Sequence, residues 1–361
     1  MMSNLSVNNE SALLNAAEMK SRVYVFTPAG FTTKLALVLV FASVGAVGFV
    51  GNVLIYYFIS FKKMTVSYMQ YNPFLRNFNF YIKSLALSDI LSNIVSLPLI
   101  CIQIMVDVFQ HGWACRIVRF IAILLPSITM NNLMIISLER YLSTRAVPRS
   151  FSVSTVRKLV YTAWLVGFIV VLGPTAMFKG IRYGLNDTHY TVICKYDNSY
   201  LPFRIITVWY VLVQHLIPSV ILSYLNISVA KTLWTGKRKR IDIQRNNAIR
   251  ANLIATKLRG TYLLIAMTFA FIIPYSAILY YSTYVMLAKP SLDFKTDFIT
   301  RYLSVGLVYS NGAINFIIYV VQMKDFRTFL KKLFCCNGNA TNPNPPGDGI
   351  QLRAFVIPNN A

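Results

Sequence analysis

The stretch Cys115–Tyr141, CRIVRFIAILLPSITMNNLMIISLERY, decides the fold, because an apolar run separates a cysteine at one end from Glu139-Arg140-Tyr141 at the other. At ~1.5 Å rise per residue, a helix from Cys115 to Arg140 is ~37 Å long, close to a bilayer with part of its headgroups. One helix therefore places the cysteine at one membrane face and the acid–arginine pair at the other. If no other part of the chain supplies partners for these two ends, the segment is an ordinary spanning helix with charged ends.

The composition is that of a polytopic membrane protein. Hydrophobic residues make up 56% of the 361 residues and charged residues 13%, about half the charged share of a soluble domain. Proline interrupts several apolar runs, which membrane helices tolerate. Seven runs are long enough to span a bilayer: Leu35–Phe61, Phe80–Val106, Ile117–Leu138, Leu159–Phe178, Ile205–Leu233, Tyr262–Leu287 and Tyr302–Val321.

The distribution of charge predicts the orientation. With the N-terminus outside the cell, most of the 35 Lys and Arg residues fall on the cytoplasmic side, as the positive-inside rule requires. The net charge of +23 then suits anionic lipid and acidic protein partners, and nucleic acid is excluded because no soluble basic domain is present. We expect a plasma-membrane protein with an extracellular, flexible segment at residues 1–30. Glycosylation sequons on that side begin at Asn4, Asn9 and Asn186.

The cysteines divide between the two sides of the membrane. Cys115 and Cys194 are the two on the predicted outer, oxidising side, and a bridge between them would hold the loop 179–203 across the bundle. Residues 323–336 form an amphipathic helix that ends in Cys335 and Cys336, which are predicted palmitoylation sites. The Asn/Pro/Gly-rich tail at 337–361 is expected to be disordered.

Asp89 is the carboxylate that lies deep within a predicted span. A charge there costs ~2.5–3.5 kcal/mol even on the lenient insertion scale. It is either a neutral, hydrogen-bonded structural acid or a cation site or protonation switch. Its candidate partners are Thr129, Asn311 and Asn315.

Together these features resemble the rhodopsin-like G protein-coupled receptor family over residues 31–336. Each motif alone is weak, but their order and separations are specific. The matching positions are Gly51-Asn52, Leu85-Ala86-Leu87-Ser88-Asp89, Trp113 before Cys115, Glu139-Arg140-Tyr141, Trp164, Pro174, Pro218, Pro274, Asn315 to Tyr319, Phe326 and Arg327.

The resemblance implies an all-α membrane protein, a bundle of seven transmembrane helices (31–322) followed by a short amphipathic cytoplasmic helix. It implies a receptor rather than an enzyme, which activates heterotrimeric G proteins once Arg140 is released from Glu139. The family's switch residues fall on Tyr141, Tyr224 or Asn226, Asn315 and Tyr319, and its allosteric sodium site falls on Asp89, Thr129, Asn311 and Asn315. No other cofactor is implied.

The chain departs from the family pattern at four places. The sixth span reads Phe271-Ile272-Ile273-Pro274 and lacks the tryptophan associated with activation, and Asn315-Phe316-Ile317-Ile318-Tyr319 has phenylalanine for the usual proline. Asn226 stands where a tyrosine is common, and Ile254 where some members carry an acid that pairs with the arginine. In the resting state Arg140 therefore lacks one of the acidic partners that hold the arginine in some family members.

The sequence defines the ligand less well than it defines the fold. Ala122 replaces the aspartate of amine receptors, and Tyr309 replaces the lysine that anchors retinal in opsins, so neither class is expected. Arg119 either pairs with an acidic ligand group or extends to the headgroups, and the aromatic and cationic rim slightly favours a peptide. By position, the cavity residues are Gln103, Arg119, Ile123, Pro126, Gln214, His215, Tyr275, Leu279, Tyr302 and Tyr309.

Two other function classes stay open. The first is a ligand-binding receptor with weak or no G protein coupling, acting as a scavenger or through arrestin. The second, more remote, is a membrane transporter, against which stands the lack of a visible inverted repeat. An intramembrane protease would need a second carboxylate facing Asp89, and His111, His189 and His215 are too dispersed for a metal enzyme.

Overall fold

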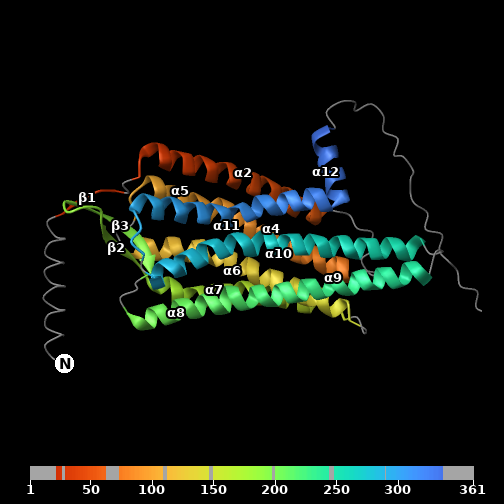
Figure 1. Cartoon of the computed structure of the whole chain (residues 1–361). Coiled ribbons are helices and arrows are strands. Elements are labelled where there is room, and N and C mark those ends of the chain that lie inside the picture. The colour runs from red at the N-terminus through yellow and green to blue at the C-terminus, as the bar shows by residue number, and fades with distance from the viewer. Residues whose placement is uncertain are drawn as a thin grey trace, which may run out of the picture.

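A computed structural model describes residues 22–26, 29–61, 73–108, 112–145, 149–196, 200–243, 248–288 and 290–335. Within these ranges, seven helices are long and apolar enough to cross a membrane, so the predicted number of spans and the all-helical class are confirmed. The helices lie side by side as one elongated bundle (Figure 1). We call the end that carries the strands the hairpin end, and the opposite end the α12 end.

The elements follow a simple order along the chain. In that order they are β1 (Val23–Tyr24), α2 (Phe31–Phe61), α4 (Pro73–Leu91), η1 (Ser92–Ser96), α5 (Leu97–Met105), α6 (Gly112–Ser143), α7 (Val153–Ala176), β2 (Phe178–Gly184), β3 (His189–Tyr196), α8 (Leu201–Val211), η2 (Leu212–Leu216), α9 (Ile217–Ile243), α10 (Ala248–Ala288), α11 (Phe294–Gln322) and α12 (Lys324–Cys335).

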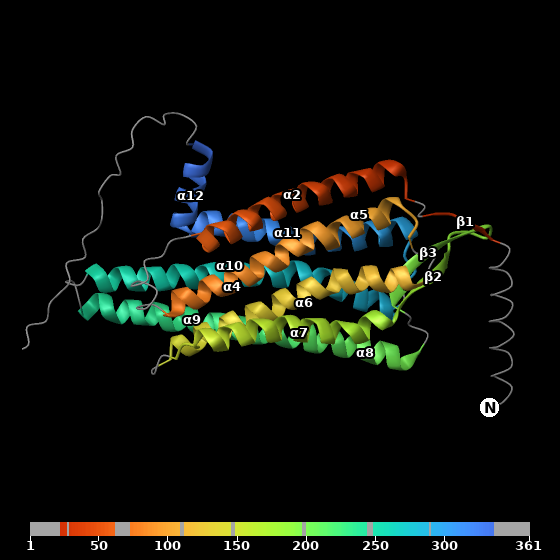
Figure 2. The same cartoon turned by 180° about the vertical axis from the view of Figure 1, so that it is seen from behind.

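Helix α6, which contains the stretch quoted above, lies at the centre of the bundle. It contacts α4, α7, α9 and α10, and from behind it is seen running between α4 and α7 (Figure 2). A helix with neighbours on most sides presents each of its faces to another element. Groups at both ends of α6 therefore meet partners from several parts of the chain.

The helices extend beyond the apolar runs from which they were predicted. The last span was expected from Tyr302, but α11 starts at Phe294. The carboxylate of Asp293 caps this helix by accepting hydrogen bonds from the backbone N–H groups of Lys295 and Thr296, at 3.2 and 3.4 Å. Hydropathy marks the membrane-embedded part of a helix, whereas capping marks its true end. The fourth span was predicted to end at Phe178, which is wrong, because Phe178 begins β2.

Two π-helical segments, η1 and η2, interrupt the second and fifth spans. Each ends two residues before a proline, Pro98 or Pro218, which has no N–H to donate to the preceding turn. These segments carry buried polar side chains, among them Asn93 and His215.

A β-hairpin covers the hairpin end, where the sequence analysis predicted a loop. Strands β2 and β3 are antiparallel, with Phe178 opposite Tyr196 and Gly184 opposite Tyr190, and β1 adds a parallel edge to β3. The predicted bridge between Cys115 and Cys194 is confirmed, with a Cα–Cα distance of 5.6 Å. It ties β3 to the first turn of α6.

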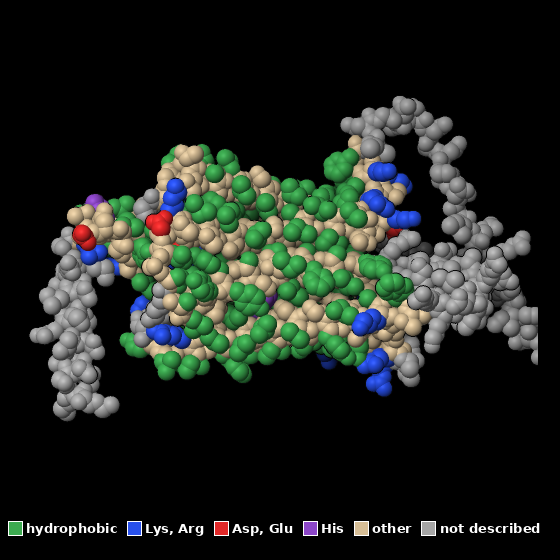
Figure 3. Space-filling view, viewed as in Figure 1, with side chains coloured by type: hydrophobic (Ala, Val, Ile, Leu, Met, Phe, Trp, Pro, Cys, Tyr) green, Lys and Arg blue, Asp and Glu red, His purple; other side chains and the backbone are tan. Residues whose placement is uncertain are grey.

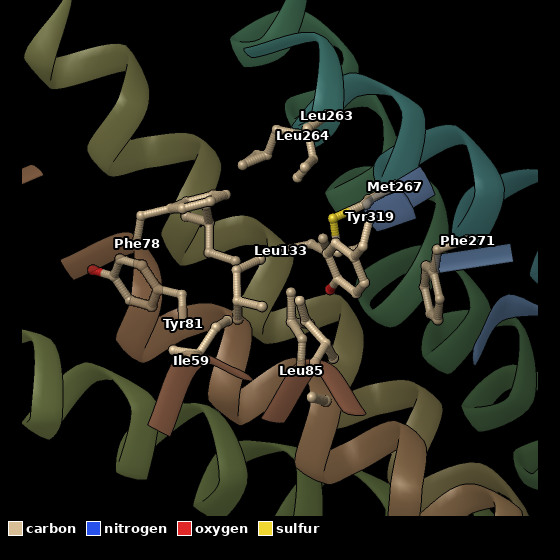
Figure 4. Close-up of a cluster of buried hydrophobic side chains, with 14 of the residues drawn as sticks. Ile59, Phe78, Tyr81, Leu85, Leu133, Leu263, Leu264, Met267, Phe271 and Tyr319 are labelled. Atoms are coloured by element: carbon tan, nitrogen blue, oxygen red, sulfur yellow. The ribbon is translucent and has the colours of Figure 1, made fainter. Parts of the chain in front are cut away.

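The interior of the bundle is apolar and its outer face is apolar as well. The main cluster of buried side chains includes Tyr81, Leu133, Met267 and Tyr319 (Figure 4). On the visible face, hydrophobic side chains cover the middle of the bundle, while Lys and Arg gather near its two ends (Figure 3). This belt is the pattern expected for a surface in contact with lipid.

The glycines of α2 allow close packing with neighbouring helices. A Cβ built on Gly51 would meet the Cβ and Cγ atoms of Phe316, and one built on Gly48 would lie 2.9 Å from the side-chain nitrogen of Asn93. Phe316 is the residue that replaces the usual proline, so its ring occupies space that Gly51 leaves open. Close helix packing therefore explains these glycines.

Candidate functional site

A cavity of about 390 Å³ opens at the hairpin end. Its walls come from α5, α6, α10 and α11, and the hairpin contributes Phe178, Cys194, Lys195 and Tyr196. The volume lies in the range of cavities that bind small ligands or one or two peptide side chains. We call it the outer cavity.

Four contacts hold the hairpin across the outer cavity. Besides the disulfide, Arg116 donates from Nε to the Phe178 carbonyl at 3.2 Å, and the Tyr183 hydroxyl donates to the Leu292 carbonyl at 3.0 Å. The Lys195 ammonium pairs with Asp297 at 3.3 Å. The hairpin is thus fixed both to α6 and to the start of α11, so it is a built wall of the cavity.

Asp297 is the centre of a charged cluster beside the outer cavity. Its carboxylate accepts two hydrogen bonds from Arg301 at 2.8 and 3.1 Å and one from the Tyr281 hydroxyl at 2.7 Å, in addition to the pair with Lys195. Burial lowers the pKa of Lys195, and the nearby Arg301 guanidinium acts in the same direction, while Asp297 opposes both. The cluster joins β3, α10 and α11.

Arg119 projects from α6 into the outer cavity. Its guanidinium lies 5.8 Å from the Phe178 ring centroid, and its buried Nε has no hydrogen-bond partner among the described residues. A guanidinium in this position attracts anions, because burial removes water that would otherwise solvate it.

The ligand residues predicted from the sequence fall into two groups. Five line the outer cavity: Arg119, Ile123, Tyr275, Leu279 and Tyr309. The other five do not line it: Gln103, Pro126, Gln214, His215 and Tyr302. Arg301 and Lys195 also line the cavity, although neither is among the ten ligand residues predicted from the sequence.

Polar contacts account for two of the second group. Gln214 donates to the Ser127 carbonyl at 3.5 Å, and the His215 ring lies 2.8 Å from the Ser276 hydroxyl. Gln103 is buried, and its amide nitrogen and oxygen have no partner among the described residues.

Asp89 lies deeper in the bundle, with the amide partners that were predicted. It is 4% exposed, and its carboxylate accepts hydrogen bonds from Asn315 at 2.9 Å and Asn311 at 3.4 Å. The Thr129 hydroxyl lies 3.1 Å from the hydroxyl of Ser88, the residue before Asp89. A second cavity of about 20 Å³ adjoins Asp89, Thr129 and Asn311, and Pro126 also lines it.

Glu139 and Arg140 are buried near the α12 end. Glu139 accepts hydrogen bonds from the Asn77 side chain at 2.6 Å and the Phe151 backbone N–H at 3.2 Å, two partners that the sequence analysis did not name. Arg140 is 5% exposed, lies 4.9 Å from the Phe78 ring centroid, and reaches α10, where a Cβ on Gly260 would lie 2.8 Å from its guanidinium. The side chain of Arg145 lies close to that of Tyr141.

The remaining switch residues take different positions. Asn226 is buried and bridges three helices, accepting from Ser137 at 3.3 Å and donating to Thr268 at 3.0 Å. Tyr224 is 61% exposed at the surface of the bundle, so of these two candidates Asn226 is the one that faces the interior. Tyr319 is fully buried in the main apolar cluster.

Two aromatic side chains of α10 contact each other and link the walls of the two cavities. Phe271 lines the small cavity and Tyr275 lines the outer one, and their ring centroids are 5.3 Å apart. Val308 and Tyr309 line both cavities. These contacts lie where the sequence lacks the family's tryptophan.

The predicted modification sites are covered only in part. Asn186 is exposed at the hairpin turn, where its side-chain oxygen accepts a hydrogen bond from the His189 N–H at 2.7 Å. Asn4, Asn9 and Cys336 lie outside the described residues, as do the segment 1–21 and the tail, and Cys335 is described only as the last residue of α12.

Known proteins resemble the chain along most of its length. Residues 49–319 match the family described as 7 transmembrane receptor (rhodopsin family). The silkworm (Bombyx mori) Allatostatin-A receptor is 22% identical over 87% of this chain and 81% of its own, and the zebrafish (Danio rerio) Galanin receptor 2a is 24% identical over 90% and 84%. The human Probable G-protein coupled receptor 19 is 24% identical over 71% of this chain, which spans 59% of that relative.

A solved structure agrees with the fold. The crystal structure of squid rhodopsin superposes with a TM-score of 0.67, at 18% identity, over 87% of this chain and 90% of that one. The family match covers well over half of the chain and contains Asp89, Arg140 and Tyr319. The chain is therefore a multi-pass membrane protein, a signalling receptor rather than an enzyme, and belongs to the rhodopsin family of seven-transmembrane receptors.

Proposed function

We propose that this receptor binds an extracellular ligand, with a preference for a peptide, in the outer cavity and activates heterotrimeric G proteins at the α12 end. The single observation that carries the coupling half of this proposal is the position of Arg140. It is buried between α6 and α10 near the α12 end, where Gly260 leaves room for its guanidinium. A separation of α10 from α6 would expose that guanidinium to a partner.

The preference for a peptide has two supports. The relatives include receptors named for allatostatin, galanin and bombesin, which are peptides. The outer cavity also has a cationic, aromatic mouth formed by Lys195, Tyr196 and Arg301, and such a mouth suits acidic or aromatic side chains of a peptide.

Two states of the bundle would couple the ligand to the G protein. A ligand that binds one packing better than the other shifts the equilibrium by its difference in affinity. Contacts between Tyr275 and Phe271, and walls shared through Val308 and Tyr309, give the outer cavity a physical connection to the Asp89 region. Asn226 and Tyr319 are proposed to stabilise the open inner end.

The residues around Asp89 fit a sodium ion. The side-chain oxygens of Asn93, Asn311 and Asn315 are buried without a hydrogen-bond partner among the described residues. Asn93 and Asn311 line the cavity of about 20 Å³ together with Asp89, and Asn315 donates to the Asp89 carboxylate. Hard oxygen donors of this kind suit a small cation, and the volume holds about one water-sized group. We propose that Asp89, Thr129, Asn311 and Asn315 hold the ion, which supplies a positive charge that compensates the carboxylate in the resting state.

The same proposal places the receptor in the plasma membrane with the hairpin end outside. Asn4, Asn9 and Asn186 would then carry glycans, and Cys335 and Cys336 would be palmitoylated next to anionic lipid. Arrestin is a further cytoplasmic partner in this scheme. Helix α12 carries Lys324, Arg327, Lys331 and Lys332 against Asp325, and this excess of positive charge supports the cytoplasmic placement of that end.

The test is nucleotide exchange on a panel of purified Gα subunits by the receptor in lipid nanodiscs. We expect measurable basal exchange on at least one subunit, abolished by Arg140→Ala. The matched control is Arg157→Ala, which removes an exposed arginine near the start of α7 and should leave exchange unchanged. No exchange on any subunit, or exchange that survives Arg140→Ala, would overturn coupling in favour of a receptor that acts through arrestin or as a scavenger.

A further inference from the structure

The charges that line the outer cavity are all of one sign. Among the described residues of its wall, Arg119, Lys195 and Arg301 are charged and none is acidic. They come from three separate elements, α6, β3 and α11, so they converge on the cavity only in the folded receptor. A convergent cationic wall of this kind requires either an internal counter-charge or an external one.

Asp297 is the internal counter-charge, and it is already paired. Asp297 accepts hydrogen bonds from Arg301 and Tyr281 and forms the ion pair with Lys195. A carboxylate has about four acceptor positions, and these partners occupy most of them. One negative charge faces three positive ones, so a positive excess stays in the cavity.

That excess is located at Arg119. Among the described residues, no carboxylate forms an ion pair with it, and its Nε is buried without a hydrogen-bond partner. Its guanidinium lies over the Phe178 ring, 5.8 Å from the ring centroid. A guanidinium fork matches carboxylate and phosphate oxygens in pairs.

The rest of the wall is apolar, which defines the other part of the ligand. Ile123, Ile278, Leu279 and Val305 line the cavity, and Tyr275 and Tyr309 add aromatic surface. We infer that the outer cavity binds an anionic group, a carboxylate or a phosphate, carried on an aromatic or branched apolar stem, with Arg119 as its main partner and Lys195 and Arg301 in support. This inference rests on the proposed function, because it names the chemistry of the ligand that the receptor recognises.

Asp297 has a second role in this scheme, since it competes with the ligand. While it holds Lys195 and Arg301, these cations contribute less to an incoming anion. Removing its charge should therefore strengthen anion binding, although it weakens the contact between the hairpin and α11. A variant that binds a ligand more tightly is informative because a damaged fold does not produce that result.

The experiment uses the full receptor in nanodiscs without G protein and follows its thermal unfolding by tryptophan fluorescence. The probes are N-acetyl-L-phenylalanine, its neutral amide and phenyl phosphate, each at about 10 mM, because a fragment of this size binds with a Kd on the order of 1 mM. We expect the carboxylate to raise Tm by about 2–5 °C and the amide to leave it unchanged. The phosphate arm shows whether the site accepts both oxyanions or the carboxylate alone.

Three variants complete the test. Arg119→Gln should abolish the Tm shift, while the control Arg182→Gln, an exposed arginine on the hairpin, should retain it. Asp297→Asn should lower the apparent Kd of the carboxylate about threefold or more. Equal shifts with acid and amide, or a full shift in Arg119→Gln, would overturn the inference. Basal, Arg140-dependent nucleotide exchange is measured separately and needs no ligand, so failure of the anion site and failure of the proposed coupling are distinguishable.

Discussion

Replacing Gly51 by alanine tests the contact between α2 and α11. The new Cβ would meet the Cβ and Cγ atoms of Phe316. These atoms are close to the backbone and cannot move away by a rotamer change alone, so one of the helices has to shift. Overpacking of this kind costs about 1–3 kcal/mol, whereas alanine in a helix is favoured over glycine by up to about 1 kcal/mol.

The control Gly173→Ala separates these two effects. Gly173 also lies in a spanning helix, but a Cβ there meets nothing within 4 Å, so this variant contains only the gain in helix propensity. The difference in unfolding free energy between the two variants should therefore equal the steric cost, about 1–3 kcal/mol. The assay is thermal and denaturant unfolding of the purified receptor in detergent micelles. If Gly51→Ala is as stable as Gly173→Ala, the reasoning is refuted.

Three further perturbations have defined outcomes. Cys115→Ser should lower the free energy of unfolding by about 2–4 kcal/mol relative to the oxidised wild-type receptor, and reductant should lower the wild-type value by a similar amount; a Cys115→Ser variant with the Tm of the oxidised wild type would contradict this. Asp89→Asn should remove the increase in Tm that sodium chloride produces relative to choline chloride, which at tenfold excess over Kd is worth about 1.4 kcal/mol; a persistent sodium effect would place the ion elsewhere. Asn226→Ala should destabilise the receptor by about 1–3 kcal/mol, because the hydroxyls of Ser137 and Thr268 lose their buried partner, whereas Tyr224→Phe at the exposed neighbouring site should change it by less than about 0.5 kcal/mol.

Some features of the fold follow directly from residue type. Length and hydropathy predict the seven spans because a bilayer requires about 20 apolar residues per helix. The pairing of Cys115 with Cys194 followed from the oxidising side of the membrane, and the amide partners of Asp89 were found because a deep carboxylate requires donors. In each case one strong physical requirement leaves few alternatives.

Other features depend on register and on distant contacts. The hairpin was missed because many residues of β2 and β3 are half exposed, so the strands lack a clear alternation of apolar and polar residues. The choice between Tyr224 and Asn226 depended on the rotational phase of α9, which the sequence does not settle in a helix with apolar residues on most sides. Lys195 and Asp297 are far apart in sequence, and their pairing requires the hairpin to be placed first.

The altered sixth span keeps an aromatic contact at the level where the family's tryptophan is missing. Ile272 takes that position in the motif, but Phe271 is buried against Tyr275 on the same helix. Tyr275 also meets the Tyr210 hydroxyl at 3.4 Å and the edge of the His215 ring, whose centroid lies 5.2 Å away. A ligand that moves Tyr275 therefore moves a group packed against Phe271, at the wall of the Asp89 cavity. The contact between Phe271 and Tyr275 therefore links the walls of the two cavities although the tryptophan is absent.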